Sequence, residues 1–188
     1  MISATDFRKG TKFLYNNAPH SVVDFQKVKP GKGGAFVRTK MKNLLTGSIY
    51  EETFRSEEKF PEPDLARREM QYLYHDGEFY NFMDQESYEQ AAFSPSQIET
   101  VKDFLKEQSI YDVLYFEGNP IAVTPPLFME LQVTQTQPGV RGDTAQGGAT
   151  KPATLETGLV LNVPLFVNEG DLVKVDTRDS SYIERVKK

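Results

Sequence analysis

The residues best suited to chemistry lie in one basic segment near the N-terminus. Residues 27–42 contain six Lys or Arg side chains and no acidic one. At the centre, Pro30, Gly31 and Gly33 surround Lys32, and this composition predicts a hairpin tip that holds the Lys32 amine away from the body of the protein. The neighbouring basic residues are Lys29, Arg38, Lys40 and Lys42. A lone Lys in a turn would only discourage strand pairing, but this group of cations favours binding to the phosphates of a polyanion.

Two common phosphate-binding motifs do not fit this segment. A Walker loop would need Gly at position 26 and Ser or Thr at position 33, where the chain has Gln26 and Gly33. The dinucleotide fingerprint would need a third glycine where Phe36 stands. An enzyme with Lys32 as its nucleophile is a weaker alternative, because a tip exposed to water offers no burial to activate the amine.

Metal, redox and acid–base centres are not indicated elsewhere. The chain has no Cys, which excludes disulfides, zinc thiolates and a cysteine nucleophile. Its two histidines, His20 beside Pro19 and His75 in a turn, are expected at the surface, and neither has a second His at ligand spacing. Carboxylates are scattered and form no calcium-loop pattern. We therefore expect no catalytic residues, no metal and no bound cofactor.

The elements that position the basic tip are predicted to be mostly β-strands. Tyr and Phe supply an aromatic content of 12% and fall in short alternating runs that end at Gly, Pro or Asn. These runs predict hairpins over residues 72–82, with an Asp-Gly turn, over 112–123 and over 172–186. Pro120 would be limited to an edge strand or to the start of a strand.

One stretch predicts a helix. Ser94 can act as the N-cap, with Pro95 at the first helical position and Gln97 completing a capping box. The following apolar residues fall at spacings of three and four and predict one buried face over about three turns. They are Ile98, Val101, Phe104 and Leu105. We expect this helix, residues 94–107, to brace a core.

Two connectors divide the 188 residues into three segments. Residues 57–64 are acidic with two prolines, and residues 124–126 contain Pro125-Pro126. The predicted domains are therefore 1–64, 65–127 and 128–188, each near the size of a small β-barrel. Their formal charges are +3, −7 and −1, although the whole chain carries −5. A basic N-terminal domain thus precedes an acidic middle domain.

The chain shows no membrane or secretion signal. Its start lacks the apolar stretch of a signal peptide, and no run approaches the length of a membrane span. We expect a soluble cytoplasmic protein.

The last third carries a more specific pattern. Residues 151–170 contain Lys, Ala, Gly, a Val-Pro pair and a final Gly at spacings that resemble the signature of bacterial elongation factor P. Three other segments also resemble that family. Residues 30–33 resemble its modified-lysine loop, residues 142–145 its third-domain loop, and residues 43–47 the strand after the tip. The resemblance covers essentially the whole chain.

This resemblance implies an all-β fold of three small barrels in an L shape. The first would be a KOW/SH3-like barrel and the other two OB-folds, with the single short helix in the middle domain. It also implies that the protein is not an enzyme. Members of the family bind the ribosome beside peptidyl-tRNA, as monomers, and relieve stalling at consecutive prolines.

The resemblance also assigns roles to residues. Lys32 would bear a covalent extension, and its loop, Pro30 to Gly33, would reach along the CCA end of peptidyl-tRNA toward the peptidyl-transferase centre. A lysine here argues against rhamnosylation of an arginine, and leaves β-lysylation, an aminopentanol group or no modification, with a lysine-modifying enzyme as a further partner. From charge alone we expect Lys29, Arg38, Lys40 and Lys42 to hold phosphates.

Other roles implied by the resemblance lie in the last two domains. Gly142, Asp143 and Thr144 would face the small subunit and the exit-site codon. Tyr182 and Arg185 would lie near the tRNA anticodon stem, with core packing an equal alternative for Tyr182. The acidic middle domain would face a basic ribosomal protein, such as the large-subunit stalk protein at the exit site, or remain exposed. The alternative function is that of a generic OB-fold RNA-binding protein, or a paralogue, with no role in peptide transfer.

Overall fold

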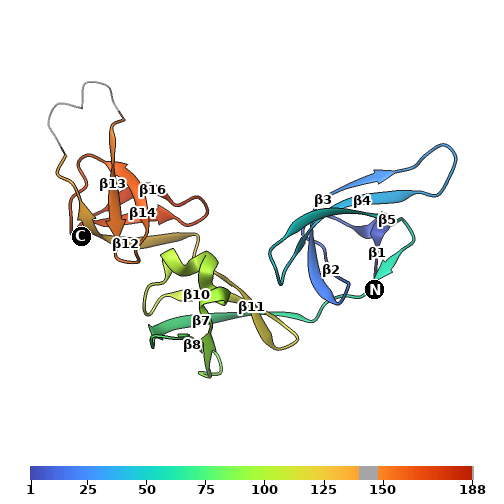
Figure 1. Ribbon diagram of the computed structural model, residues 1–188, viewed down its shortest axis with the longest axis horizontal. Helices are drawn as coiled ribbons and strands as arrows, with labels where there is room; N and C mark the ends of the chain where they lie inside the picture. Colours follow the sequence, from blue (N-terminus) through green and yellow to red (C-terminus); the bar gives the residue numbers. More distant parts are fainter. Residues whose placement is uncertain (140–147, 188) are drawn as a thin grey trace. The chain divides into compact units, whose positions relative to one another are not determined.

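The computed structural model describes residues 1–139 and 148–187 and consists mostly of antiparallel strands (Figure 1). The predicted loop contacts Gly142, Asp143 and Thr144 lie outside the described residues. The chain divides into two compact units, one of residues 1–67 with 114–122 and the other of residues 68–113 with 123–188. No helix in the described ranges is long and apolar enough to cross a membrane.

The N-terminal part is a four-stranded antiparallel sheet with a small two-stranded sheet. Its elements are β1 (Ile2–Ser3), the 3-10 turn η1 (Ala4–Asp6), β2 (Lys12–Tyr15), β3 (Ala18–Val28), β4 (Phe36–Asn43), β5 (Ile49–Arg55) and β6 (Lys59–Phe60). The strand order is β2-β3-β4-β5, and β1 pairs with β6. Phe7, Phe13, Phe54 and Phe60 pack together in its core, with the rings of Phe7 and Phe13 4.6 Å apart.

The connector predicted over residues 57–64 contains a short strand at Lys59 and Phe60. These two residues form β6, which pairs with Ser3 and Ile2 of β1. The cause is burial, because Phe60 is only 5% exposed and its ring lies 4.8 Å from that of Phe54. Because the Phe60 ring packs in the core, the backbone at residues 59–60 returns to the sheet and pairs with β1.

The expectation that His20 lies at the surface is wrong. His20 is 1% exposed and packs against the rings of Phe13, Tyr15 and Tyr50. Its Nδ1 lies 2.9 Å from the carbonyl oxygen of Ala18 and its Nε2 lies 2.7 Å from the Tyr50 hydroxyl. A carbonyl only accepts, so Nδ1 carries a proton. Both ring nitrogens thus find partners inside the core. His75, by contrast, is exposed at the end of a strand.

Residues 65–124 form a five-stranded sheet and a short helical segment. Its elements are β7 (Leu65–His75), β8 (Tyr80–Asp84), β9 (Gln90–Phe93), α1 (Pro95–Ile98), the 3-10 helix η2 (Glu99–Phe104), β10 (Ile110–Phe116) and β11 (Asn119–Thr124). The strand order is β11-β10-β7-β8-β9. The predicted hairpins at 72–82 and 112–123 are confirmed. Pro120 lies in β11, an edge strand, as predicted.

The predicted helix begins where expected but is shorter and changes type. The predicted capping box is confirmed, because the backbone N–H of Ser94 donates to Gln97 Oε1 at 2.8 Å and the backbone N–H of Gln97 donates to the Ser94 side chain. Only residues 95–98 are α-helical, and residues 99–104 form a 3-10 helix. The three buried side chains explain the change, because Ile98, Val101 and Phe104 are spaced by three residues. A helix with three residues per turn keeps such positions on one line, whereas an α-helix would rotate them apart.

The last five strands form the C-terminal sheet. They are β12 (Phe128–Thr136), β13 (Thr150–Leu155), β14 (Val160–Pro164), β15 (Leu172–Asp176) and β16 (Ser181–Val186), in the order β14-β13-β12-β15-β16. The predicted hairpin at 172–186 is confirmed. Within the second compact unit this sheet contacts the helical segment, since Lys106 Nζ donates to the Glu130 carbonyl at 3.0 Å and lies 3.1 Å from Glu156 Oε1. Thr157 Oγ1 also donates to the Asp103 carbonyl at 2.6 Å.

Candidate nucleic-acid interface

The Lys32 tip is the connection of a long two-stranded ladder. The pairing of β3 with β4 ends at Val28 and Phe36, and residues 29–35 join the two strands. Figure 1 shows that this hairpin reaches beyond the other strands of its sheet. Residues 29–34 are all exposed, and no carboxylate of the described residues lies within ion-pair distance of Lys32. The hairpin therefore presents its lysine to solvent, where a partner can reach it.

Gly33 gives the tip its shape. Its φ of 120° lies in a region that side chains with a Cβ rarely adopt. A Cβ at Gly31 or Gly34 would meet no atom within 4 Å, and one at Gly33 would meet only Pro30 Cγ at 3.8 Å, an ordinary van der Waals contact. The backbone on both sides of Lys32 is therefore open to close approach by another molecule.

The strand after the tip lines up three cations. In β4, Val37, Thr39 and Met41 are buried, whereas the residues between and after them are exposed. The exposed residues are Arg38, Lys40 and Lys42. Because side chains alternate along a strand, these three cations share the outer face of the sheet, about 6.6–6.8 Å apart. The segment predicted to contact phosphates thus forms a basic row behind the Lys32 tip.

Neighbouring strands bring acids to the same face. Asp24 of β3 and Glu51 of β5 lie opposite Lys40 from its two sides. Glu51 Oε1 lies 3.7 Å from Arg38 Nε, and Asp24 Oδ1 lies 3.2 Å from Lys9 Nζ. The hydrogen bond from Lys9, together with the backbone N–H of Phe25, lowers the pKa of Asp24.

Because of these acids, Arg38 of the basic row has a carboxylate partner and Lys42 has none among the described residues. Lys42 lies opposite Ser21 and Ile49, and no described carboxylate is within ion-pair distance of it. Arg55, opposite Phe36, adds a further cation that the analysis of residues 27–42 missed. Both the acids and Arg55 lie outside that segment in sequence, so only the strand register could have placed them beside it.

The strand after the tip ends earlier than the resemblance implied. Residues 44–48 form a turn, in which the Asn43 side-chain oxygen accepts hydrogen bonds from the backbone of Leu45 at 2.8 Å and of Thr46 at 3.2 Å. Gly47 has a φ of 77°. Asn and Gly at these positions therefore end β4 instead of extending it.

Tyr182 and Arg185 lie three residues apart on β16, an edge strand of the C-terminal sheet. Tyr182 is half-buried opposite Val175, and burial raises the pKa of its phenol, although a hydrogen bond from the backbone of Arg185 opposes that shift. The Arg185 guanidinium lies 5.1 Å from the ring centroid of Phe166, and its Nη1 lies 3.6 Å from Asp171 Oδ2. The sequence analysis missed Phe166 and Asp171, which come from the loop before β15.

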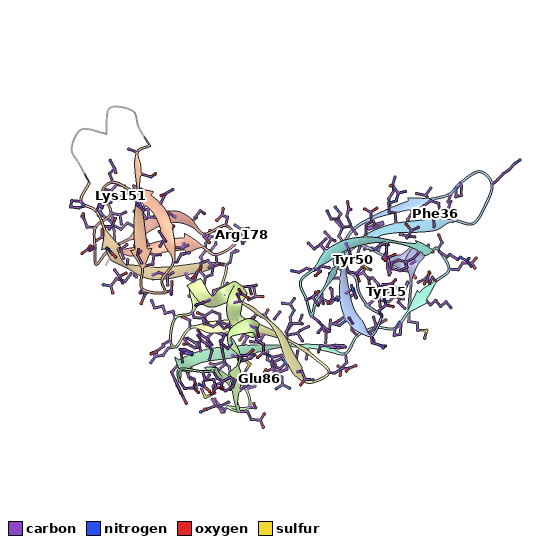
Figure 2. All side chains as sticks on the ribbon, viewed as in Figure 1. Tyr15, Phe36, Tyr50, Glu86, Lys151 and Arg178 are labelled. Atoms are coloured by element: carbon purple, nitrogen blue, oxygen red, sulfur yellow. The ribbon has the colours of Figure 1, made fainter. Side chains whose placement is uncertain are left out.

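Lys151 of the family-like pattern is a buried residue. It is 6% exposed, and its Nζ donates to the Gln137 carbonyl at 2.6 Å (Figure 2). Lys151, Ala153 and Leu155 all point to the buried side of β13. This lysine therefore joins the ends of β12 and β13 and is not part of an exposed basic surface.

Comparison with known proteins covers the described fold from end to end. Three family models match, described as the elongation factor P KOW-like domain at residues 3–60, the elongation factor P OB domain at residues 65–123 and the elongation factor P C-terminal domain at residues 129–185. Elongation factor P of Caldanaerobacter subterraneus subsp. tengcongensis is 55% identical over 186 residues, which cover 99% of this chain and 100% of that protein. The chain belongs to the elongation factor P family.

Other members and one solved structure agree with this assignment. Elongation factor P of Clostridioides difficile is 55% identical, again over 99% of this chain and 100% of that protein. A solved structure described as eukaryotic translation initiation factor 5A from Methanococcus jannaschii covers 66% of this chain and 93% of its own, with a TM-score of 0.54 and 23% identity, and shows likeness in fold. The predicted family and the predicted KOW-like and OB barrels are confirmed, and the protein is a translation elongation factor. The boundaries at residues 64 and 127 stay predictions.

Proposed function

We propose that this elongation factor binds the ribosome beside peptidyl-tRNA and speeds peptide-bond formation at consecutive prolines. The observation that carries this proposal is the β3–β4 hairpin, which presents Lys32 at its exposed tip with open backbone on both sides. A slender projection with one amine at its end suits a narrow site such as the peptidyl-transferase centre. Membership of a translation elongation factor family supports the same assignment.

Proline explains why positioning alone can raise the rate. Its ring fixes φ and makes its nitrogen a hindered secondary amine, so consecutive prolines leave the reacting ends poorly oriented. Holding two reactants in a productive geometry removes an entropic barrier without adding a catalytic group. In this proposal the loop from Pro30 to Gly33 contacts the CCA end of peptidyl-tRNA, and a covalent extension on the Lys32 amine lengthens its reach. The exposed amine is accessible to a modifying enzyme.

The remaining surfaces take supporting roles in this proposal. Lys29 and the row of Arg38, Lys40 and Lys42 hold RNA phosphates near the tip. The acidic middle domain, with a formal charge of −7, faces a basic protein such as the ribosomal stalk protein at the exit site. Tyr182 and Arg185 contact the tRNA toward its anticodon stem, and Gly142 to Thr144 face the exit-site codon.

Synthesis of a reporter with three consecutive prolines tests the proposal. Purified ribosomes would be assayed with and without the protein isolated from its native host, after mass spectrometry has defined the state of Lys32. A matched reporter without prolines is the control. We expect faster synthesis of the proline reporter alone. Binding to ribosomes without any effect on the proline reporter would contradict the proposal and favour a general RNA-binding protein.

A further inference from the structure

An exposed aromatic ring beneath Arg185 has no role in the function proposed above. Phe166 lies in the loop between β14 and β15 and is 56% exposed, although Val167 beside it is fully buried. The Arg185 guanidinium lies 5.1 Å from the centroid of the Phe166 ring. Exposing an aromatic ring to water adds no stability, so the position of Phe166 is better explained by its contact with Arg185.

The loop that carries this ring is ordered by its own hydrogen bonds. The backbone N–H of Val167 donates to the Pro164 carbonyl at 3.1 Å, and that of Asp171 donates to the Asn168 carbonyl at 3.1 Å. The backbone N–H of Asn168 also donates to Asp171 Oδ2 at 2.9 Å. With Val167 buried as an anchor, the Phe166 ring is held on a fixed support.

Two contacts fix the guanidinium while leaving its donors available. The guanidinium carbon lies over the Phe166 ring at 5.1 Å from its centroid, and Asp171 Oδ2 attracts one corner at 3.6 Å from Nη1. That distance exceeds the 2.7–3.2 Å of a hydrogen bond, so the ion pair does not use up an N–H group. The Arg185 side chain is 41% exposed. An ordered planar fork with free N–H groups matches the geometry of a phosphate.

We propose that Phe166 is a positioning residue that presents Arg185 to an RNA phosphate. The exposed part of the Phe166 ring also offers a surface on which an unpaired base can stack, and aromatic rings beside Arg are typical of RNA sites. Asp171 repels a phosphate and a protein carboxylate alike, so the exposed ring, which a base can cover and a carboxylate cannot, is the feature that favours RNA. This inference rests on the proposed function, which places the C-terminal barrel against tRNA.

Binding to ribosomes that carry peptidyl-tRNA tests the role of the ring. Phe166→Ala should raise Kd about two- to fivefold, the range expected from losing an exposed cation–π contact. Arg185→Ala should raise Kd more. It should also make the fall of log K with log salt less steep, by about 0.7–0.9 in the slope. In the Arg185→Ala background, Phe166→Ala should raise Kd by less than it does alone, because only the stacking of a base on the ring is then lost. Phe166→Tyr should bind like the unaltered protein. Val160→Ala, which alters another exposed apolar side chain of the same barrel, is the matched control and should bind normally.

Two outcomes would overturn this inference. One is a Kd for Phe166→Ala equal to that of the unaltered protein. The other is a photo-crosslink from p-azidophenylalanine at position 166 that reaches only ribosomal protein and no RNA. Failure of the unaltered protein to speed the proline reporter would instead contradict the proposed function, so the two failures are distinguishable. Equal melting temperatures of the variants would exclude misfolding as the cause of a change in Kd.

Discussion

Removing the Glu51 carboxylate should tighten binding to the ribosome. Glu51 Oε1 lies 3.7 Å from Arg38 Nε and opposite Lys40 in the strand register, so it offsets the charge of the basic row. A phosphate bound by Arg38 would lie about 7 Å from Glu51, and the repulsion at that distance is about 0.6 kcal/mol in water. Screening at physiological salt reduces it by about half. Glu51→Gln should therefore lower Kd by about 1.5- to threefold.

The assay is equilibrium binding of labelled protein to ribosomes over a series of salt concentrations. Glu86→Gln, the same change in the turn between β8 and β9 of the acidic middle domain, is the matched control and should not lower Kd, because no basic row lies beside it in sequence (Figure 2). Lys42→Gln should weaken binding, because no described carboxylate compensates this cation. It should also make the fall of log K with log salt less steep, by about 0.7–0.9 in the slope. Unchanged or weaker binding by Glu51→Gln would refute the assignment of this face to phosphates. Glu51 is exposed, so the folded state should lose little stability.

Two further predictions concern the helical segment of the second compact unit. Burial raises the pKa of Tyr111 to about 12. The folded state therefore holds the phenol proton more tightly than the unfolded state does. The free energy of unfolding, measured by chemical denaturation followed by circular dichroism, should be unaffected by this group below pH 10 and should fall as the pH rises from 10 to 12. Tyr111→Phe should remove that alkaline loss, but should cost about 1–3 kcal/mol at pH 8 because the Phe104 carbonyl and the Lys106 N–H lose their partner. For the ion pair of Lys106 with Glu156, a double-mutant cycle of Lys106→Met and Glu156→Gln should give a coupling of about 0.2–1 kcal/mol, and zero coupling would refute its role.

Features that depend on adjacent residues could be predicted from the sequence. The three hairpins and the start of the helix follow from turn residues, alternation and a cap, all of which act within a few residues. The Lys32 tip is of the same kind, since Pro and Gly on either side of it define the turn. The basic row also follows from alternation along β4.

Features that depend on distant residues could not be predicted. His20 is buried because Tyr50, thirty residues later, supplies a hydrogen-bond partner. Glu51 reaches Arg38 only through the register of β4 with β5. Phe166 and Arg185 come from a loop and a strand whose contact requires the folded barrel. A single sequence shows the types of these residues but not the pairing that decides their roles.

The role of Lys32 is tested most directly by the rate of peptide-bond formation between consecutive prolines. This rate would be measured on purified ribosomes under single-turnover conditions, at a saturating concentration of the factor. Ribosome binding of each variant would be measured in parallel. Lys32→Ala and Lys32→Arg should both bind, with at most the loss of one phosphate contact for Lys32→Ala, yet leave the rate near that without the factor. Full stimulation by Lys32→Ala would contradict the account, because the hairpin would then not act through its lysine.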